Sequence, residues 1–98
     1  MPCYRLLCLA KPDTPPSELT TLFRSVARIV YREKGQFRTI ENLGVRPLAY
    51  PARVQGERFD DARWVECKFD LSPPGLGQVQ AALRTDESVL RFTALRAR

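Results

Sequence analysis

Few residue types able to do chemistry occur in this chain, which has 98 residues, no histidine and three cysteines. Without histidine, a Ser-His-Asp triad, a Cys-His pair and any metal site that uses imidazole are excluded. Cys3, Cys8 and Cys67 form no CxxC pair, and no secretory signal precedes them. We therefore expect a reducing compartment, buried thiols at Cys8 and Cys67, and no catalytic residue, metal ion or cofactor.

Arginine is the chemical group that the chain offers in quantity. Lys plus Arg number 16 against 11 Asp plus Glu, which gives a formal net charge of +5, and only three of the 16 are Lys. A guanidinium group binds phosphate through two parallel hydrogen bonds and also stacks on bases. The composition therefore predicts a polyanionic partner, with nucleic acid as the first choice; the alternative is a basic surface that only water solvates.

The arginines must be positioned by secondary structure. The periodicity of apolar residues predicts four strands. They are expected at residues 3–10, 36–51, 62–70 and 89–95, and Gly44 suggests a bulge within the second. Pro47 and Pro51 favour an edge position for that strand. The polar segment Arg53 to Asp61 is expected to form a loop or hairpin tip before the third strand.

Two helices are predicted between these strands. The first is amphipathic, with Ser17 or Thr14 as its N-cap and Gly35 as the residue that ends it. The second begins after Ser72, because the prolines that follow are preorganised for a first helical turn. The order βαββαβ is typical of an α+β, ferredoxin-like fold, in which two helices cover one face of a four-stranded antiparallel sheet.

The two faces of this sheet are expected to differ. A core beneath the helices is predicted from Leu22, Val26, Val65, Cys67, Phe69 and Phe92. The other face would carry Leu7, Leu9 and Trp64 beside Arg5, Glu66 and Lys68. Apolar patches on a face without helices indicate a partner. The alternatives are that water tolerates them or that residues 53–61 fold over them.

Residues 41–51 read Glu-Asn-Leu-Gly-Val-Arg-Pro-Leu-Ala-Tyr-Pro, which resembles the E-x-L-G-x-R-x-L-A-Y-P signature of the ribosomal protein S6 family. The opening Met1-Pro2-x-Tyr4 resembles the start of the family's sequences. Residues 86–91, Asp-Glu-Ser-Val-Leu-Arg, resemble its D-x-x-V-x-R turn into the last strand. The resemblance implies one domain over residues 1–98 and a structural, non-enzymatic constituent of the small ribosomal subunit.

The resemblance also implies partners: the central domain of small-subunit rRNA, ribosomal protein S18 and other small-subunit proteins. The arginines expected to contact rRNA are Arg5, Arg46, Arg53, Arg84 and Arg91. The residues expected to face a protein partner are Leu48, Tyr50 and Trp64. For each arginine the alternative is a solvated surface charge, and for Tyr50 it is a place in the core.

Two other functions fit the same element order. An RNA-recognition motif would bind single-stranded RNA, but the third strand of that module carries a glycine and aromatics on which bases stack. Residues 62–69 of this chain, Ala-Arg-Trp-Val-Glu-Cys-Lys-Phe, have no glycine and place a carboxylate where a base would stack. An enzyme of the acylphosphatase kind would need an anion-binding loop after the first strand. Residues 11–16 there, Lys-Pro-Asp-Thr-Pro-Pro, lack the glycines of such a loop.

The compartment is predicted from the same resemblance. The run Glu41 to Gly44 and the Met-Pro start look closer to mitochondrial members, so the mitochondrial ribosome is expected and the bacterial cytoplasm is the alternative. No cleavable presequence is expected, because the first strand begins by Cys3. No apolar run approaches the roughly 20 residues that a membrane span requires.

Overall fold

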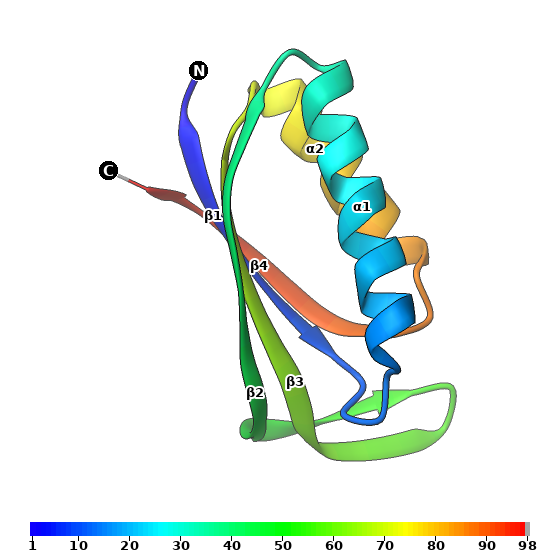
Figure 1. Cartoon of the computed structure of the whole chain (residues 1–98). Helices are drawn as coiled ribbons and strands as arrows, with labels where there is room; N and C mark the ends of the chain where they lie inside the picture. Colours follow the sequence, from blue (N-terminus) through cyan, green and yellow to red (C-terminus); the bar gives the residue numbers. More distant parts are fainter. Residues whose placement is uncertain (98) are drawn as a thin grey trace.

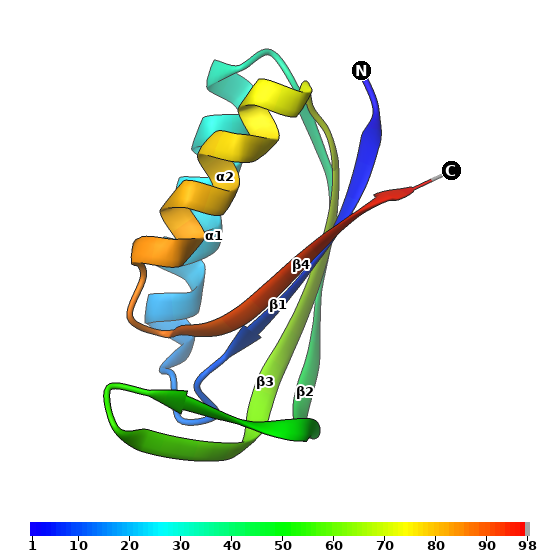
Figure 2. The same ribbon diagram turned by 180° about the vertical axis from the view of Figure 1, so that it is seen from behind.

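The computed structural model describes residues 1–97 as four strands and two helices. In chain order these are β1 (Cys3–Ala10), α1 (Pro16–Arg32), β2 (Gln36–Val54), β3 (Glu57–Asp70), α2 (Pro73–Thr85) and β4 (Val89–Ala97). The strands form one sheet in the order β2-β3-β1-β4, and each neighbouring pair is antiparallel. Both helices lie on the same side of this sheet (Figures 1 and 2). The predicted ferredoxin-like fold is confirmed.

The core lies between the sheet and the helices, as the alternation of side chains predicts. On β1, Tyr4, Leu6, Cys8 and Ala10 are buried, while Arg5 points to the other face and is exposed. Five of the six predicted core residues are buried: Leu22, Val26, Val65, Cys67 and Phe69. Phe92 is partly buried and packs against this cluster.

Both ends of α1 differ from the prediction. The N-cap is Pro15, which makes no side-chain cap bond, rather than Ser17 or Thr14. Thr14 is buried, and its hydroxyl instead donates to the Lys11 carbonyl oxygen at 2.7 Å. At the other end the left-handed residue is Lys34, with φ 63°, and not Gly35.

Gly35 is required for a different reason. A Cβ atom placed there would lie 2.2 Å from the carbonyl oxygen of Asp70, which no side chain can occupy. The absence of a side chain therefore lets the chain pass close to the end of β3 as it turns from α1 into β2. At α2 the prediction is confirmed, since the Ser72 hydroxyl accepts the Gly75 N–H at 3.3 Å.

The β2–β3 hairpin is longer than predicted. Of the two alternatives predicted for residues 53–61, the hairpin tip is correct and the loop is wrong: β2 continues to Val54, and β3 begins at Glu57. The turn is only Gln55-Gly56, both at positive φ (53° and 79°), as in the tight turns that match strand twist. The bulge predicted at Gly44 is confirmed, with φ 85° and its N–H bonded to Asn42 Oδ1 at 2.9 Å. β2 is an edge strand, as its prolines predict.

Burial of the cysteines gives a first testable prediction. Desolvation raises the pKa of the Cys8 and Cys67 thiols to about 12, so neither forms thiolate near neutral pH. Desolvation and a hydrogen bond with Asp70 also raise the pKa of the Cys3 thiol, but Cys3 is only partly buried, so a reagent can reach it. Iodoacetamide at pH 8 should therefore label Cys3 in the native chain and all three cysteines in urea, as counted by mass spectrometry. Rapid native labelling of Cys8 or Cys67 would show that the faces of the sheet are inverted.

Candidate partner and nucleic-acid interface

The sheet face opposite the helices, here called the open face, combines apolar and charged side chains. β1 contributes Arg5, Leu7 and Leu9, which lie opposite Lys68, Glu66 and Trp64 of β3. β4 adds Leu95, which is 52% exposed and lies opposite Arg5. No helix within residues 1–97 lies over this face (Figures 1 and 2). The predicted set of face residues is therefore brought together.

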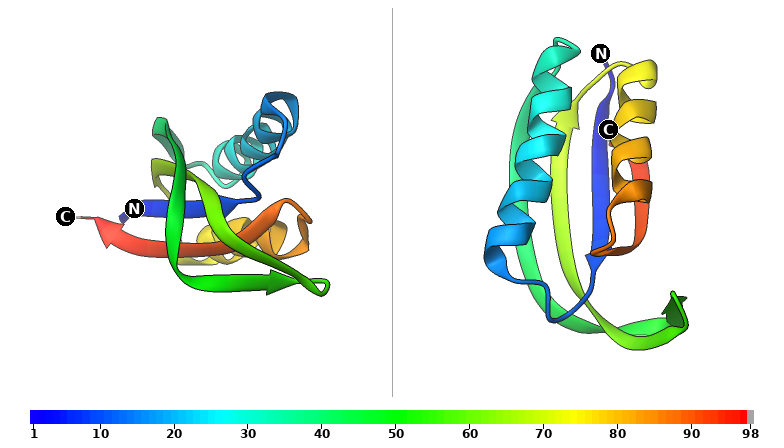
Figure 3. Two further views of the ribbon diagram at one scale, coloured as in Figure 1. Left: turned by 90° about the horizontal axis from the view of Figure 1, so that it is seen from below. Right: turned by 90° about the vertical axis from the view of Figure 1, so that its right-hand side faces the viewer.

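The far end of the β2–β3 hairpin covers the lower end of the open face. This hairpin arm, residues 48–60, turns away from the rest of the sheet and passes beneath the ends of β1 and β4 (Figures 1 and 3). Ala52 and Phe59, paired across the arm, are both buried, and the Lys11 ammonium lies 5.7 Å from the Phe59 ring centre. Leu9 and Trp64 are half-buried. The sequence suggests residues 53–61 as a segment that could fold over the open face. That alternative is therefore correct for the end of the open face that the arm covers.

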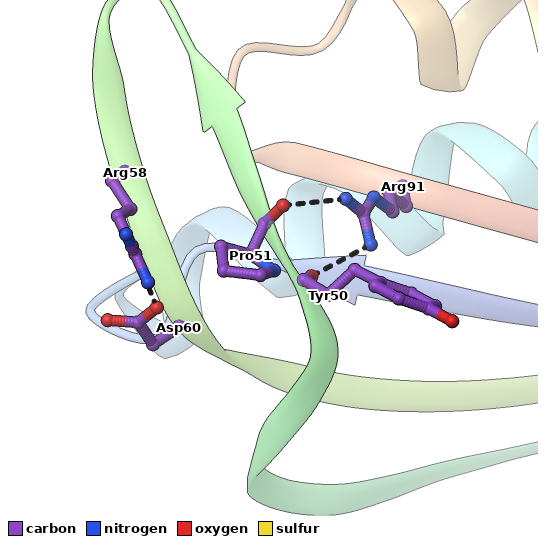
Figure 4. Close-up of polar contacts among 5 residues, drawn as sticks. All are labelled: Tyr50, Pro51, Arg58, Asp60 and Arg91. Atoms are coloured by element: carbon purple, nitrogen blue, oxygen red, sulfur yellow. Dashed lines mark hydrogen bonds and ion pairs between the residues drawn. The ribbon is translucent and has the colours of Figure 1, made fainter.

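Arg91 fastens the hairpin arm to β4. Its guanidinium donates to the carbonyl oxygen of Tyr50 at 3.1 Å and to that of Pro51 at 3.0 Å (Figure 4). Arg91 lies opposite Leu9 in the register, so it projects from the open face toward the arm. Sequence reasoning assigned Arg91 to rRNA and missed this contact, because it joins residues 40 positions apart. The rRNA contact stays a prediction.

Removing this guanidinium should loosen the arm selectively. Arg91→Gln is expected to speed amide hydrogen exchange in residues 48–60 and to lower the free energy of unfolding by about 1 kcal/mol, since the bonds are solvent-exposed. Arg58→Gln is the matched control, because Arg58 pairs with Asp60 at 3.0 Å on the same arm and both side chains are exposed. That control should cost less than about 0.5 kcal/mol. Equal rates of amide hydrogen exchange in the two variants would show that Arg91 does not hold the arm in place.

The three predicted protein-facing residues lie in different surroundings. Tyr50 is 75% exposed on the arm, so it is not a core residue. Leu48 is half-buried at the base of the arm. Trp64 lies half-buried on the open face, and its Nε1–H has no partner within the described residues. A buried indole N–H normally finds an acceptor, but this nitrogen is covered by the chain itself, so the part of Trp64 open to a partner is the exposed part of its ring.

The five predicted rRNA arginines are not gathered in one place. Arg5 projects from the open face, while Arg46 and Arg53 are exposed along β2. Arg84 ends α2 on the helix side, where its guanidinium lies 5.7 Å from the Phe92 ring centre. The structure therefore divides them between two sides of the sheet, and only Arg5, Arg46 and Arg53 lack an assigned side-chain contact within the described residues.

One ion pair was not anticipated from the sequence. The Arg38 guanidinium donates to Asp70 Oδ2 through Nε at 2.8 Å and through a second nitrogen at 2.5 Å. The hydrogen bond from Arg38 lowers the pKa of the Asp70 carboxyl, and the same bond raises the pKa of Arg38. An irregularity in pairing between Phe37 and Thr39 brings Arg38 to this position. Any stabilisation from the pair is present above the ordinary pKa of aspartate and is lost on further acidification.

Within residues 1–97, no three Cys, Asp or Glu side chains come close enough to one another to hold a metal ion. No helix in this part of the chain is long and apolar enough to cross a membrane.

Comparisons with solved structures identify the fold. The structure of ribosomal protein S6 from Thermotoga maritima aligns over 98% of this chain and 87% of its own, with a TM-score of 0.80 and 21% identity. The C-terminal domain of the MgtC protein from Mycobacterium tuberculosis aligns with a TM-score of 0.65 and 12% identity over 99% of this chain and 88% of its own. Because two differently named proteins share this fold, the fold alone does not decide the function.

Sequence comparisons decide the family. The small ribosomal subunit protein bS6 of Geobacter sulfurreducens is 30% identical over 95% of this chain and 76% of its own length. The bS6 protein of Geotalea daltonii is 25% identical over 98% of this chain and 72% of its own. The family model described as ribosomal protein S6 matches residues 3–96. This match spans β1 to β4 and includes the signature in β2, so the chain belongs to the ribosomal protein S6 family.

Proposed function

We propose that the chain, as one domain, is a structural component of the small ribosomal subunit and binds its rRNA together with ribosomal protein S18. Members of the S6 family are structural, non-enzymatic proteins, and relatives of this chain are named as small-subunit proteins. The single observation that carries the proposal is the open face. It presents apolar side chains that the fold itself leaves half-exposed, next to arginines held on rigid strands.

The protein partner is assigned to the open face and the arm. Leu7, Leu95 and Trp64 offer an apolar surface there, and Tyr50 extends it on the arm. Large exposed apolar side chains with a polar rim are typical of protein interfaces. Arg5 lies within this surface, and Arg46 lies on the nearby edge strand. These two arginines would therefore bind rRNA phosphates at the rim of the protein contact.

We also propose that the ribosome in question is mitochondrial. The support is the Glu-Asn-Leu-Gly run at the start of the signature and the arginine-rich composition. Bacterial relatives do not decide between a mitochondrion and a bacterial cytoplasm. A tagged full chain should be recovered with the mitochondrial fraction of cells, and exclusion from mitochondria would reject this part of the proposal alone.

Assembly is tested by sedimentation. After expression, a tagged full chain should cosediment with small ribosomal subunits in a sucrose gradient and be retained at a salt concentration that removes loosely bound basic proteins. The control is an unrelated protein of similar size and charge in the same gradient. Recovery only at the top of the gradient, as free protein, would contradict a structural role in the subunit.

A further inference from the structure

A groove runs between α1 and β2 on the helix side of the sheet, away from the open face. Its volume is about 550 Å³, within the range of sites that hold small organic groups. Phe23, Phe37, Ile40 and Val65 provide apolar surface, with the helix side chains of Leu19 and Ala27 beside them. Ile40 is 50% exposed, so this apolar surface is open to solvent.

The polar groups of the groove suit a ligand that combines a negative charge with a nucleobase able to form hydrogen bonds. Arg24 lines the groove, and no carboxylate is among the lining residues. The Asn42 Oδ1 accepts the Gly44 N–H at 2.9 Å, which leaves the Asn42 amide hydrogens free to donate. Thr20 donates its hydroxyl to the Pro16 carbonyl oxygen at 3.0 Å, which leaves its oxygen free to accept.

The exposed face of α1 continues the positive charge beyond the groove. Arg28 lies four residues after Arg24, and Tyr31 lies seven residues after Arg24, so the three side chains form one stripe along the helix. All three are exposed, Tyr31 by 60%. Within residues 1–97 no carboxylate forms an ion pair with Arg24 or Arg28. Unneutralised arginines beside an exposed aromatic ring are typical of surfaces that bind single-stranded nucleic acid.

A peptide strand added to β2 is the competing occupant, and the shape of β2 disfavours it. An added strand needs a regular edge, but the pairing of β2 shifts at Phe37/Thr39, Asn42/Gly44 and Pro47/Ala52. Regular pairing therefore lasts for only four residues at a time near the groove. A membrane surface is disfavoured because the apolar side of α1 is buried in the core and cannot insert.

We propose that this groove binds an unstacked base of single-stranded RNA, with the neighbouring phosphates on Arg24 and Arg28 and a second base stacked on Tyr31. Bases enter apolar clefts readily when aromatic side chains replace their stacking partners. This surface lies on the opposite side of the sheet from the open face. It therefore gives the protein a second RNA contact, which does not depend on the function proposed above.

Methyl NMR of the full chain titrated with an unstructured, uridine-rich nine-nucleotide RNA tests the proposal. The methyl signals of Ile40 and Val65 should shift, whereas those of Leu7 and Leu95 on the open face should not. The double variant Arg24→Gln/Arg28→Gln should lose about tenfold in affinity. Its slope of log affinity against log salt should fall by about 1.4, since each phosphate contact to a single strand contributes about 0.7.

Matched controls distinguish a general loss of positive charge from the loss of contacts within the groove. Arg58→Gln/Arg96→Gln removes the same charge from exposed positions outside the groove and should change affinity less than about twofold. Polyphosphate, which carries no bases, should leave the Ile40 signal unchanged. Ile40→Glu places a carboxylate in the groove at a position that is 50% exposed, and it should abolish RNA binding.

Three outcomes would overturn the proposal. One is an RNA-induced shift centred on Leu7 and Leu95, which would place the RNA on the open face. Another is no shift at millimolar RNA. The third is a shift of the groove signals by an alternating Val-Thr peptide but not by RNA, which would assign the groove to a protein segment. None of them affects cosedimentation with the subunit, so failure here is distinguishable from failure of the proposed function.

Discussion

Replacing Phe69 with alanine should lower the free energy of unfolding by about 3 to 5 kcal/mol, the usual cost of emptying a large buried aromatic site. Phe69 is fully buried in β3, between Tyr4 of β1 and Phe37 of β2 in the strand register. Its ring centre lies 6.4 Å from that of Tyr4 and 6.1 Å from that of Phe37. Truncation would leave a cavity at the centre of the sheet, where neighbouring strands hold the backbone in place.

Urea unfolding followed by Trp64 fluorescence measures this loss. Leu95→Ala is the matched control, because Leu95 also lies in a strand but is 52% exposed and should cost less than about 1 kcal/mol. If Phe69→Ala cost no more than the control, the side chains of β3 would have been assigned to the wrong faces. Comparing the two losses of unfolding free energy therefore tests which side chains of the strands face the core, as well as how deeply they are buried.

Alternation made most of the sheet predictable. In β1 and the second half of β3, every other residue is apolar and buried, because one face packs on the helices. The arm could not be predicted in the same way, because both faces of most of it contact water and only Ala52 and Phe59 are buried. Its turn, Gln-Gly, also lacks the Asn or Asp that usually precedes the glycine of a tight hairpin.

The prediction for the C-terminal end of α1 was wrong for a physical reason that the local sequence does not carry. Gly35 was expected to supply a left-handed conformation, but Lys34 adopts that conformation and Gly35 makes room for the Asp70 carbonyl oxygen. The second requirement comes from β3, which is more than 30 residues away in the sequence. Arg91 is a similar case, since its two acceptors are backbone atoms that any sequence would present.

The candidate site was therefore predictable as a surface but not as a set of contacts. The alternation in β1 and β3 placed Arg5, Leu7 and Trp64 on one face without reference to any other element. Which of these residues the arm covers depends on how the hairpin bends. That bend follows from the register shift between Pro47 and Ala52, which no residue pattern specified beyond the presence of prolines.

Replacing both Leu48 and Trp64 with aspartate should abolish the help that a protein partner gives to RNA binding. If the open face docks S18, the lone chain should bind rRNA weakly and gain affinity when the partner is present, because the partner fixes its orientation and adds basic surface. Two carboxylates within an apolar contact would be desolvated without compensation, and a loss of 2 kcal/mol or more, about thirtyfold in affinity, is expected. The measurement is an rRNA titration with and without the partner.

The design must separate docking from folding, because Trp64 is half-buried and its replacement could disturb β3. Tyr50→Asp avoids that problem, since Tyr50 is 75% exposed and contributes only its backbone to the Arg91 contact. Val45→Asp is the matched control: Val45 is 47% exposed, and it lies opposite Arg63 on the other face of the sheet from Trp64. The docking model requires that Tyr50→Asp weaken the partner's effect and that Val45→Asp leave it intact, both with an unchanged unfolding midpoint. Tight binding by the lone chain, unaffected by Leu48→Asp/Trp64→Asp, would instead mean that the protein contacts RNA without a partner on the open face.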